Sequence, residues 1–535
     1  GKLLVEGLVG HLVAAKLLLN TPTSFAIDEK GRFYVVESQR LCDGAIIDIR
    51  GARQFTLQDF TLQTVEKRRQ MLLADKTKDK YTVSSERVVL LDGLDGDGIP
   101  HQRYDYVVDG MGNAEDGLAF SALTYDNQVF LTCIPNLWKF EDRDGDHKAE
   151  VREKLLTGFG VGISMMGHDM HGIIRGPDGR LYWSIGDRGY NVVTKEGTTL
   201  KAPNSGAIFR SEPDGSHMEV FFHGLRNPQE IAFDEFGNLM TFDNTGDFGD
   251  IARVVYALEG GDAGWTKEHQ APHQYKWAFP DNDVMTSNSR WTEENMFRPD
   301  MDDQPQWLLP PVGNFQSGPS GIVYAAGESL PDSLRGTFLV TNYRGDANNC
   351  NILSFKLSVD GAGFKLRDKD PLVMSSGIGA SDIDLGYDGR IYILDFGGGW
   401  SANDRGAIHA VEYPPGLAKP SVQETKAIFA EGFKKRQDLQ KLLSHADFRV
   451  RQRAQFELVE RNDAKALLQT LSGSEGLTAK LHALWGLGQL HRAGKGDFLK
   501  EFMATATSTE VELRVSACRI LGDVQAPSAA KVLLT

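Results

Sequence analysis

The sequence predicts a mainly β fold, a six-bladed β-propeller, followed by an α-helical domain of HEAT-like repeats. Three observations predict it. One hairpin pattern recurs over roughly the first four hundred residues. Glycine is abundant, at 57 residues, which favours many tight turns between short strands. Helical periodicity replaces strand patterning after the proline-rich segment Pro414–Pro420.

Each copy of the hairpin pattern is an apolar run, a turn with an acidic residue and a glycine, and a second run rich in aromatic or β-branched residues. A hairpin that cannot bury both of its faces must stack on its neighbours, and radial stacking closes a propeller around a central channel. Six blades fit best, while five or seven stay open. The copies are Phe25–Val36, Ile173–Trp183, Ile231–Met240 and Ile383–Ile393, with looser ones at Leu118–Leu131 and Ile322–Val340.

Domain boundaries follow from the same patterns. We expect the propeller over residues 1–413, a linker over 414–425 and helical repeats over 426–535. Residues 59–75 break the hairpin pattern with helical spacing, so we interpret them as an insertion on a loop.

Small alanines mark the helical repeats. Ala454, Ala483 and Ala517 recur at intervals of 29 and 34 residues, a spacing typical of antiparallel helix pairs that stack as a solenoid. No polar capping repeat follows, so we expect the natural protein to continue past Thr535.

Composition excludes several classes of function. The chain has 58 basic and 73 acidic residues, and a formal charge of −15 disfavours binding to nucleic acid. No run of about 18 apolar residues is present, so no membrane-spanning helix is expected. The four cysteines are isolated, which argues against a zinc site and covalent haem. Buried free thiols are favoured over a disulfide.

Three segments carry polar residues that strands and turns do not require: Gly167–His171, Ile185–Gly189 and His223–Gln229. Together with Gly260–Trp265 they follow the order and spacing of a known family. Over about a hundred residues the chain resembles the soluble glucose and aldose sugar dehydrogenases that use pyrroloquinoline quinone, and Leu339–Arg344 resembles a later strand of that family more weakly.

This resemblance implies a catalytic group. His168 would be the general base that takes a hydroxyl proton as hydride leaves the same carbon for the quinone, and Asp187 would hold its tautomer. Arg226 would stabilise negative charge on a quinone oxygen, and Asn227 and Arg344 would hold the cofactor. Taken alone, each of these residues also suits a structural hydrogen bond at a turn.

The resemblance is less complete for the residues that would bind the cofactor and the calcium ion. Where the family has two cofactor-binding arginines this chain has no basic residue, and Gly379 and Ser381 stand in that segment. The quinone carboxylates would lack bidentate partners there. Asp243 and Asp247 occur where the family holds an active-site calcium, without its full ligand pattern.

A second calcium site is predicted from spacing. Asp142, Asp144 and Asp146 take positions one, three and five of a loop, and Glu153 falls at position twelve, as in an EF-type calcium loop. His147 stands where glycine is usual. The alternative is a solvated acidic turn.

The layout of the whole chain is similar to exported, membrane-bound dehydrogenase-like proteins of planctomycete-type bacteria, which join such a propeller to HEAT repeats and often to a cytochrome c domain. The resemblance implies an exported protein, periplasmic or extracellular, whose signal peptide is not in this chain. It also implies a carbohydrate or other small-molecule substrate and a cytochrome or other protein partner that binds the helical repeats. No haem-attachment sequence is present.

Two other classes of function stay open. One is a calcium-dependent propeller hydrolase or lyase that acts on glycosides or lactones, with His168 as base. The other is a non-catalytic module that binds glycans or proteins. A transition-metal pair of His168 and His171 is a further, less favoured hypothesis, because strand geometry would point the two side chains to opposite faces. The fold by itself does not choose among these.

Overall fold

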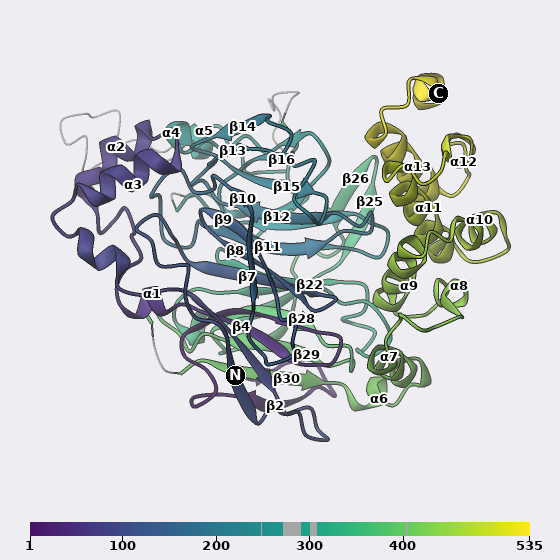
Figure 1. Cartoon of the computed structure of the whole chain (residues 1–535), viewed down its shortest axis with the longest axis horizontal. Helices are drawn as coiled ribbons and strands as arrows, with labels where there is room; N and C mark the ends of the chain where they lie inside the picture. The colour runs from purple at the N-terminus through teal and green to yellow at the C-terminus, as the bar shows by residue number, and fades with distance from the viewer. Residues whose placement is uncertain (248, 271–289, 300–307, 403–404, 535) are drawn as a thin grey trace.

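The computed structural model describes residues 1–535 except 248, 271–289, 300–307, 403–404 and 535. It contains the expected six-bladed propeller, followed by a helical region (Figure 1). All six predicted hairpins are present as the two innermost strands of a blade. The repeated turn pattern therefore predicted the number of blades correctly.

Each blade is built on a four-stranded antiparallel sheet whose first strand lies innermost. Blade 1 consists of β3 (Pro22–Ile27), β4 (Phe33–Glu37), β5 (Arg87–Asp92) and β6 (Gln102–Val107). Blade 2 consists of β7 (Ala119–Tyr125), β8 (Gln128–Cys133), β9 (Asn136–Glu141) and β10 (Val151–Thr157). Blade 3 consists of β11 (Met170–Arg175), β12 (Leu181–Ile185), β15 (Gly206–Ser211) and β16 (Glu219–Leu225), with the short β20 (Gly261–Asp262). Blade 4 consists of β17 (Pro228–Phe233), β18 (Leu239–Asp243), β19 (Ala252–Tyr256) and β21 (Gly313–Phe315). Blade 5 consists of β22 (Pro319–Tyr324), β23 (Phe338–Asn342), β24 (Asn351–Phe355) and β27 (Leu372–Ser376), with β1 (Lys2–Leu3). Blade 6 consists of β28 (Ala380–Leu385), β29 (Ile391–Asp395), β30 (Ala407–Glu412) and β2 (Val9–Ala14). Two small hairpins stand apart from the blades, β13 (Tyr190–Val193) with β14 (Thr199–Ala202) and β25 (Leu357–Asp360) with β26 (Gly363–Leu366).

The ring closes through the N-terminal part of the chain. β2 pairs antiparallel with β30, with Val9 opposite Glu412, and so supplies the outer strand of blade 6. Pairing between the two ends of the propeller sequence joins the last blade to the first, because β2 leads directly into β3. Closure of this kind leaves only short sheet edges exposed.

Polar side chains tie neighbouring inner strands together. The Thr23 hydroxyl donates to the Ala119 carbonyl at 2.8 Å, and the Asp382 carboxylate accepts from the Phe25 amide at 2.9 Å. The apolar core lies mainly between blades, for example where β4 and β5 pack against β7 and β8. Each blade is therefore stabilised by its neighbours.

Strand direction gives the propeller two different ends. The turns between the first and second strand of each blade lie at one end, which we name the turn face. The connections between blades, and the loops between second and third strands, lie at the other end, which we name the loop face. The loop face of blade 1 carries the expected helical insertion, with α1 (Gln39–Cys42), α2 (Thr56–Thr61) and α3 (Val65–Leu73). Figure 1 shows these helices on the side away from the C-terminal helices.

The C-terminal region is helical from its first residues. Residues 414–425, expected as a linker, form α6 and the first half of α7, because a proline at the first helical position fits its fixed φ. Ala454, Ala483 and Ala517 are fully buried where the helices pack on one another. The helices are α6 (Pro414–Leu417), α7 (Pro420–Glu431), α8 (Leu439–Leu442), α9 (Phe448–Glu460), α10 (Ala464–Ser472), α11 (Leu477–Arg492), α12 (Leu499–Thr505), α13 (Val511–Asp523) and α14 (Ala530–Leu533).

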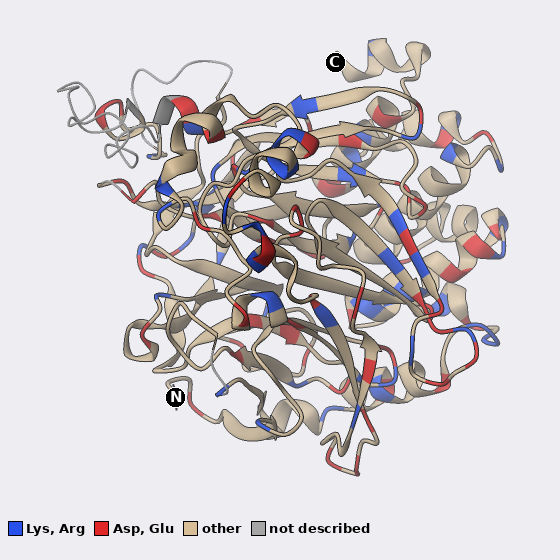
Figure 2. Ribbon diagram, turned by 60° about the vertical axis from the view of Figure 1, so that its left-hand side comes forward, with Lys and Arg blue, Asp and Glu red and all other residues tan. Residues whose placement is uncertain are grey.

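The C-terminal helices pack directly on the turn face. Arg451 in α9 pairs with Glu235 at 2.9 Å, and Arg519 in α13 donates to the Gly237 carbonyl at 3.0 Å. Figure 2 shows basic and acidic positions both in these helices and in the strands that meet them. The turns that predicted the hairpins therefore also form the surface on which the C-terminal helices pack.

α9 lies across the end of the central channel. A cavity of about 260 Å³ remains between this helix and the inner strands, and Phe448, Arg453 and Phe456 of α9 line it. Asp382 also lines it, and burial raises the pKa of this carboxyl to about 7. This end of the channel is therefore covered by α9.

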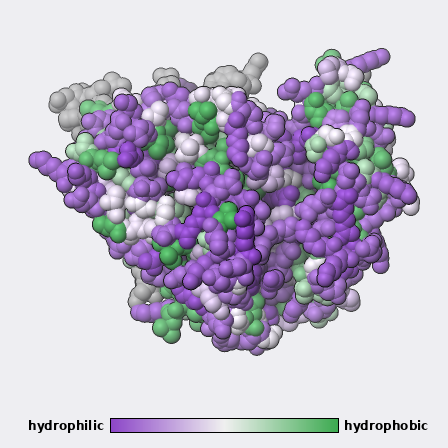
Figure 3. Space-filling model, in the orientation of Figure 1, coloured by the Kyte–Doolittle hydropathy of each residue, from purple (hydrophilic) through white to green (hydrophobic). Residues whose placement is uncertain are grey.

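No helix among the described residues is long and apolar enough to cross a membrane. The visible face of the molecule is mainly hydrophilic, and its hydrophobic residues occur in small scattered groups (Figure 3). The four cysteines, Cys42, Cys133, Cys350 and Cys518, are free.

Candidate functional site

His168 and Asp187 lie in direct contact at the loop face. His168 ends the connection from blade 2 to β11, and Asp187 follows β12. Because β11 and β12 pair with Met170 opposite Ile185, both residues lie at the same end of blade 3. The Nδ1 atom of His168 is 2.7 Å from the Asp187 carboxylate.

Two further side chains fix the Asp187 carboxylate. The Ser164 hydroxyl donates to Oδ1 at 2.6 Å, and the Trp265 indole N–H donates to Oδ2 at 3.0 Å. Burial by itself disfavours the ionised carboxylate, yet the charge and hydrogen bond of His168, with Arg226 nearby, hold the pKa of Asp187 below its usual range. Asp187 is therefore an ionised acceptor that orients the imidazole.

The electrostatics leave His168 as a neutral base. Burial lowers the pKa of His168 below its ordinary value, against the opposing influence of Asp187. With Nδ1 bound to Asp187, the proton lies on Nδ1 and the lone pair on Nε2. Among the described residues, no hydrogen bond to Nε2 is found. This nitrogen is thus available to accept a proton from a substrate.

Arg226 and Asn227 come to the same place from the connection between blades 3 and 4. The Asp187 amide donates to the Arg226 carbonyl at 2.8 Å. A Cβ atom at Gly186 would lie 2.9 Å from both Asn227 Oδ1 and the His168 Cα, so only glycine permits this close approach. Arg226 Nε and Asn227 Oδ1 are buried polar atoms for which the described part of the chain offers no hydrogen-bond partner.

Asp243 and Asp247, which the resemblance implied as calcium ligands, each pair with an arginine. Asp243 at the end of β18 accepts the Arg226 and Asn227 amides at 3.1 and 2.7 Å and pairs with Arg253. Asp247 pairs with Arg226 Nη2 at 2.8 Å. Arginine side chains already neutralise both carboxylates, so this geometry gives Asp243 a role in holding the backbone of Arg226 and Asn227.

Arg344 lies on the loop that follows β23, also at the loop face, and is exposed. Its amide donates to the Cys350 sulfur at 3.2 Å. In the described part of the chain its guanidinium contacts none of His168, Asp187 and Arg226. The structure therefore brings together four of the five residues that the resemblance implied and leaves Arg344 on the rim.

The acidic loop is at the opposite end of the propeller, between β9 and β10 on the turn face. Carboxylate atoms of Asp142, Asp144, Asp146 and Glu150 lie within 4.8 Å of one another, a donor set that suits calcium. Glu153, expected at the twelfth position, lies in β10 opposite Lys139, because the strand begins at Val151. Glu150 takes its place, so the loop is shorter than an EF-type loop.

Sequence reasoning did not find Ser164 or give a role to Trp265. Ser164 lies in an irregular connection with no motif around it. Trp265 is part of the segment Gly260–Trp265 that carried the resemblance, and a tryptophan after Gly-Asp-Ala-Gly was the available signal.

Residues 4–397 match the model of a family described as a domain of unknown function (DUF7133). The chain belongs to this family. The match covers nearly the whole propeller, including every residue of the His168 site, and ends before the helices. A search of curated protein sequences found no match.

The solved structures similar to this DUF7133 chain have low sequence identity to it and include several sugar dehydrogenases, a protein described as a gluconolactonase and a luciferin-regenerating enzyme. The aldose sugar dehydrogenase of Streptomyces coelicolor, in its PQQ-bound form, is 14% identical with a TM-score of 0.44, over 76% of this chain and 98% of that chain. The soluble aldose sugar dehydrogenase of Escherichia coli, in its apo form, is 12% identical with a TM-score of 0.45, over 76% and 99%. The PQQ domain of a pyranose dehydrogenase from Coprinopsis cinerea is 11% identical with a TM-score of 0.42, over 76% and 96%. These likenesses concern the propeller fold.

Proposed function

We propose that this chain is an oxidoreductase that oxidises a sugar or sugar-derived alcohol, with His168 as the base and a quinone as the hydride acceptor. The observation that carries the proposal is the neutral imidazole of His168, fixed through Nδ1 to a buried, ionised Asp187 and without a partner for Nε2 among the described residues. A hydroxyl group placed against Nε2 gives up its proton as the C–H bond breaks and a carbonyl forms. Pyrroloquinoline quinone, when bound, would accept the hydride.

The residues present fit the reacting end of such a cofactor. Arg226 Nε and Asn227 Oδ1 are buried near His168 with no partner in the part of the chain that the structure describes, and they would interact with a bound polar ring. Arg344 on the rim is a possible partner for a cofactor carboxylate. The segment around Gly379 and Ser381 offers no cation, so we expect weak cofactor binding.

The acidic loop supports a structural role for calcium. It lies on the turn face, whereas His168 lies on the loop face, so a cation there could not polarise a substrate at His168. This arrangement disfavours the calcium-dependent hydrolase or lyase hypothesis.

Location and partners stay predictions from the resemblance: an exported protein whose helices bind a cytochrome or another protein. Because the inner face of the helical region is packed on the propeller, we propose that such a partner would bind its outer face.

The test is a dye-reduction assay of the whole chain, reconstituted with pyrroloquinoline quinone and calcium, against a panel of aldoses and sugar alcohols. We expect turnover that falls by ~10²-fold or more in the His168→Gln variant, the usual scale for loss of a general base. His223→Gln, whose side chain is exposed on β16 of the same blade, is the matched control and should keep full turnover.

Absence of quinone-dependent turnover on every sugar would contradict the proposal. Turnover that His168→Gln retains would also contradict it. If lactone or glycoside hydrolysis were found instead, with the same dependence on His168, the hydrolase hypothesis would replace it.

A further inference from the structure

The helical insertion of blade 1 reaches across the loop face to the residues that hold His168 and Asp187. Its contact is made mainly by Asp59 at α2, whose carboxylate is 2% exposed. Asp59 accepts from the Ile163 amide at 2.5 Å and from the Ser164 amide at 3.4 Å. A residue from a loop of blade 1 thus fixes the backbone of the connection that leads to His168.

The same carboxylate binds a second segment of the site. Lys267 Nζ, which is fully buried, is 2.9 Å from Asp59 Oδ2. Lys267 begins α4 (Lys267–Gln270), two residues after Trp265. A Cβ atom at Gly162 would lie 2.9 Å from Lys267 Nζ and 3.1 Å from Asp59 Oδ1, so the three groups are tightly packed.

Asp59 therefore joins the two segments that position Asp187. Ser164 donates to one carboxylate oxygen of Asp187, and Trp265 donates to the other. Other residues of the insertion strengthen the attachment: the Ile49 amide donates to the Ser164 carbonyl at 3.0 Å, and Asp48 accepts from the Met166 amide at 3.0 Å.

We propose that Asp59, paired with Lys267, is a positioning residue of the His168 site, and that the insertion is a part of this site. The inference rests on the proposed function in that His168 is taken as the base. Asp59 acts through Ser164 and Trp265, which keep the Asp187 carboxylate aligned with Nδ1 of His168. Loss of this alignment would displace the base, and misplacement by about 1 Å can lower a rate by about 10²-fold.

The test uses two variants of the whole chain. Asp59→Asn removes the charge but leaves Lys267 buried without its partner, which can prevent folding. The double variant Asp59→Asn/Lys267→Met removes both charges and avoids that cost. Asp79→Asn, exposed in the same insertion, is the matched control. Circular dichroism and thermal unfolding confirm that each variant is folded.

Two measurements are made. The first determines kcat and KM separately in the dye-reduction assay. We expect kcat to be about 10²-fold lower and KM to change by less than about threefold. The second is the rate at which diethyl pyrocarbonate modifies His168 at pH 7, followed by mass spectrometry of the His168 peptide. We expect faster modification in the double variant, because the imidazole is no longer held in its buried position by Asp187.

The charged or titratable groups near His168 include Asp187, Arg226, Asp247 and His171, and none of these four is altered in these variants. A folded double variant with wild-type kcat and a wild-type modification rate would overturn the inference. A wild-type chain without dehydrogenase activity would overturn the proposed function instead, and the modification rates would still decide the role of Asp59.

Discussion

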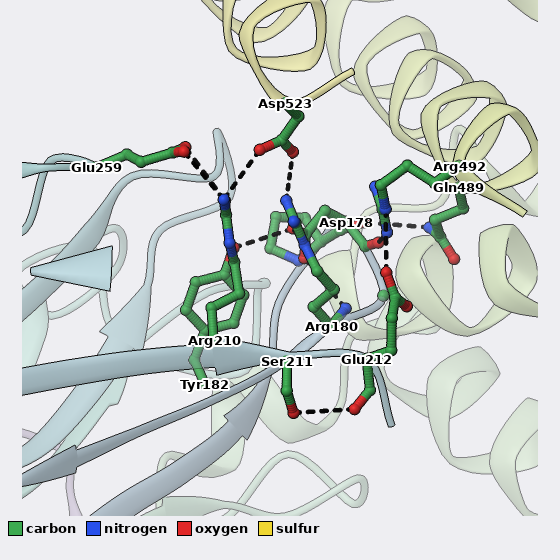
Figure 4. Close-up of polar contacts among 12 residues, drawn as sticks. Asp178, Arg180, Tyr182, Arg210, Ser211, Glu212, Glu259, Gln489, Arg492 and Asp523 are labelled. Atoms are coloured by element: carbon green, nitrogen blue, oxygen red, sulfur yellow. Dashed lines mark hydrogen bonds and ion pairs between the residues drawn. The ribbon is translucent and has the colours of Figure 1, made fainter. Parts of the chain in front are cut away.

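Asp523 at the end of α13 offers a direct test of how firmly the helices are attached to the propeller. Figure 4 shows its carboxylate between two arginines of blade 3, Arg180 and Arg210. The Asp523 side chain is 9% exposed, and those of Arg180 and Arg210 are 7% and 4% exposed. Arg492 and Gln489 of α11 approach the neighbouring turn in the same view.

The perturbation is Asp523→Asn, which keeps the volume and one acceptor oxygen but removes the charge. Breaking a buried ion pair by changing one partner costs about 3–5 kcal/mol. Here Arg210 retains Glu219 and Glu259, whose side chains are 43% and 44% exposed, and Arg180 retains Asp178. These partners compensate in part, so we expect a loss of about 2 kcal/mol in the free energy of unfolding.

The assay is thermal unfolding of the whole chain, with Asp497→Asn as control. The Asp497 side chain is 77% exposed, just before α12, so its charge should contribute within about 0.5 kcal/mol. We expect a lower Tm for Asp523→Asn alone, and the difference should persist at high salt because buried pairs are poorly screened. Equal Tm values for the two variants would refute the reasoning that buried ion pairs attach the helices.

Two further predictions concern ions and protons. Calcium should raise the Tm, and at a hundredfold excess over Kd the gain in the free energy of unfolding should be about 2.7 kcal/mol. Glu150→Gln should abolish this gain, whereas Glu153→Gln should not. An unchanged Tm between chelator and calcium would contradict the calcium site. Burial lowers the pKa of His171 to about 4, whereas histidines of the unfolded state titrate near 6.5. As the pH falls, the unfolded state therefore takes up this proton before the folded state does. The free energy of unfolding should therefore fall by about 3 kcal/mol through this residue as the pH drops from about 6.5 to 4. In the His171→Gln variant, denaturant titrations should show that the free energy of unfolding depends less steeply on pH. A wild-type slope in that variant would contradict the assignment.

The propeller could be predicted from the sequence because its signal is local and repeated. Each turn such as Asp28–Gly31 fixes a hairpin by short-range geometry, and six copies leave few ways to bury the blade faces. The contact between His168 and Asp187, which the family resemblance implied, has a different origin: the two residues flank one hairpin, so their proximity follows from the pairing of β11 with β12.

Contacts between distant segments could not be predicted in this way. Asp59 lies 208 residues from Lys267, and no periodicity links an insertion in blade 1 to the segment after Trp265. Similarly, spacing along the chain did not reveal the ion pair between Asp243 and Arg253, which the pairing of β18 with β19 brings together.

The sequence by itself thus determined the repeated hairpins, the change from strands to helices after Pro414, and the pairing of His168 with Asp187. Tertiary structure alone decided that the helices pack on the turn face, that Glu150 replaces Glu153 in the acidic loop, and that Asp59 supports the site. The physical reason is range: backbone propensity and hydrophobic periodicity act over a few residues, whereas a buried carboxylate takes whichever partner the packed chain brings within hydrogen-bonding distance.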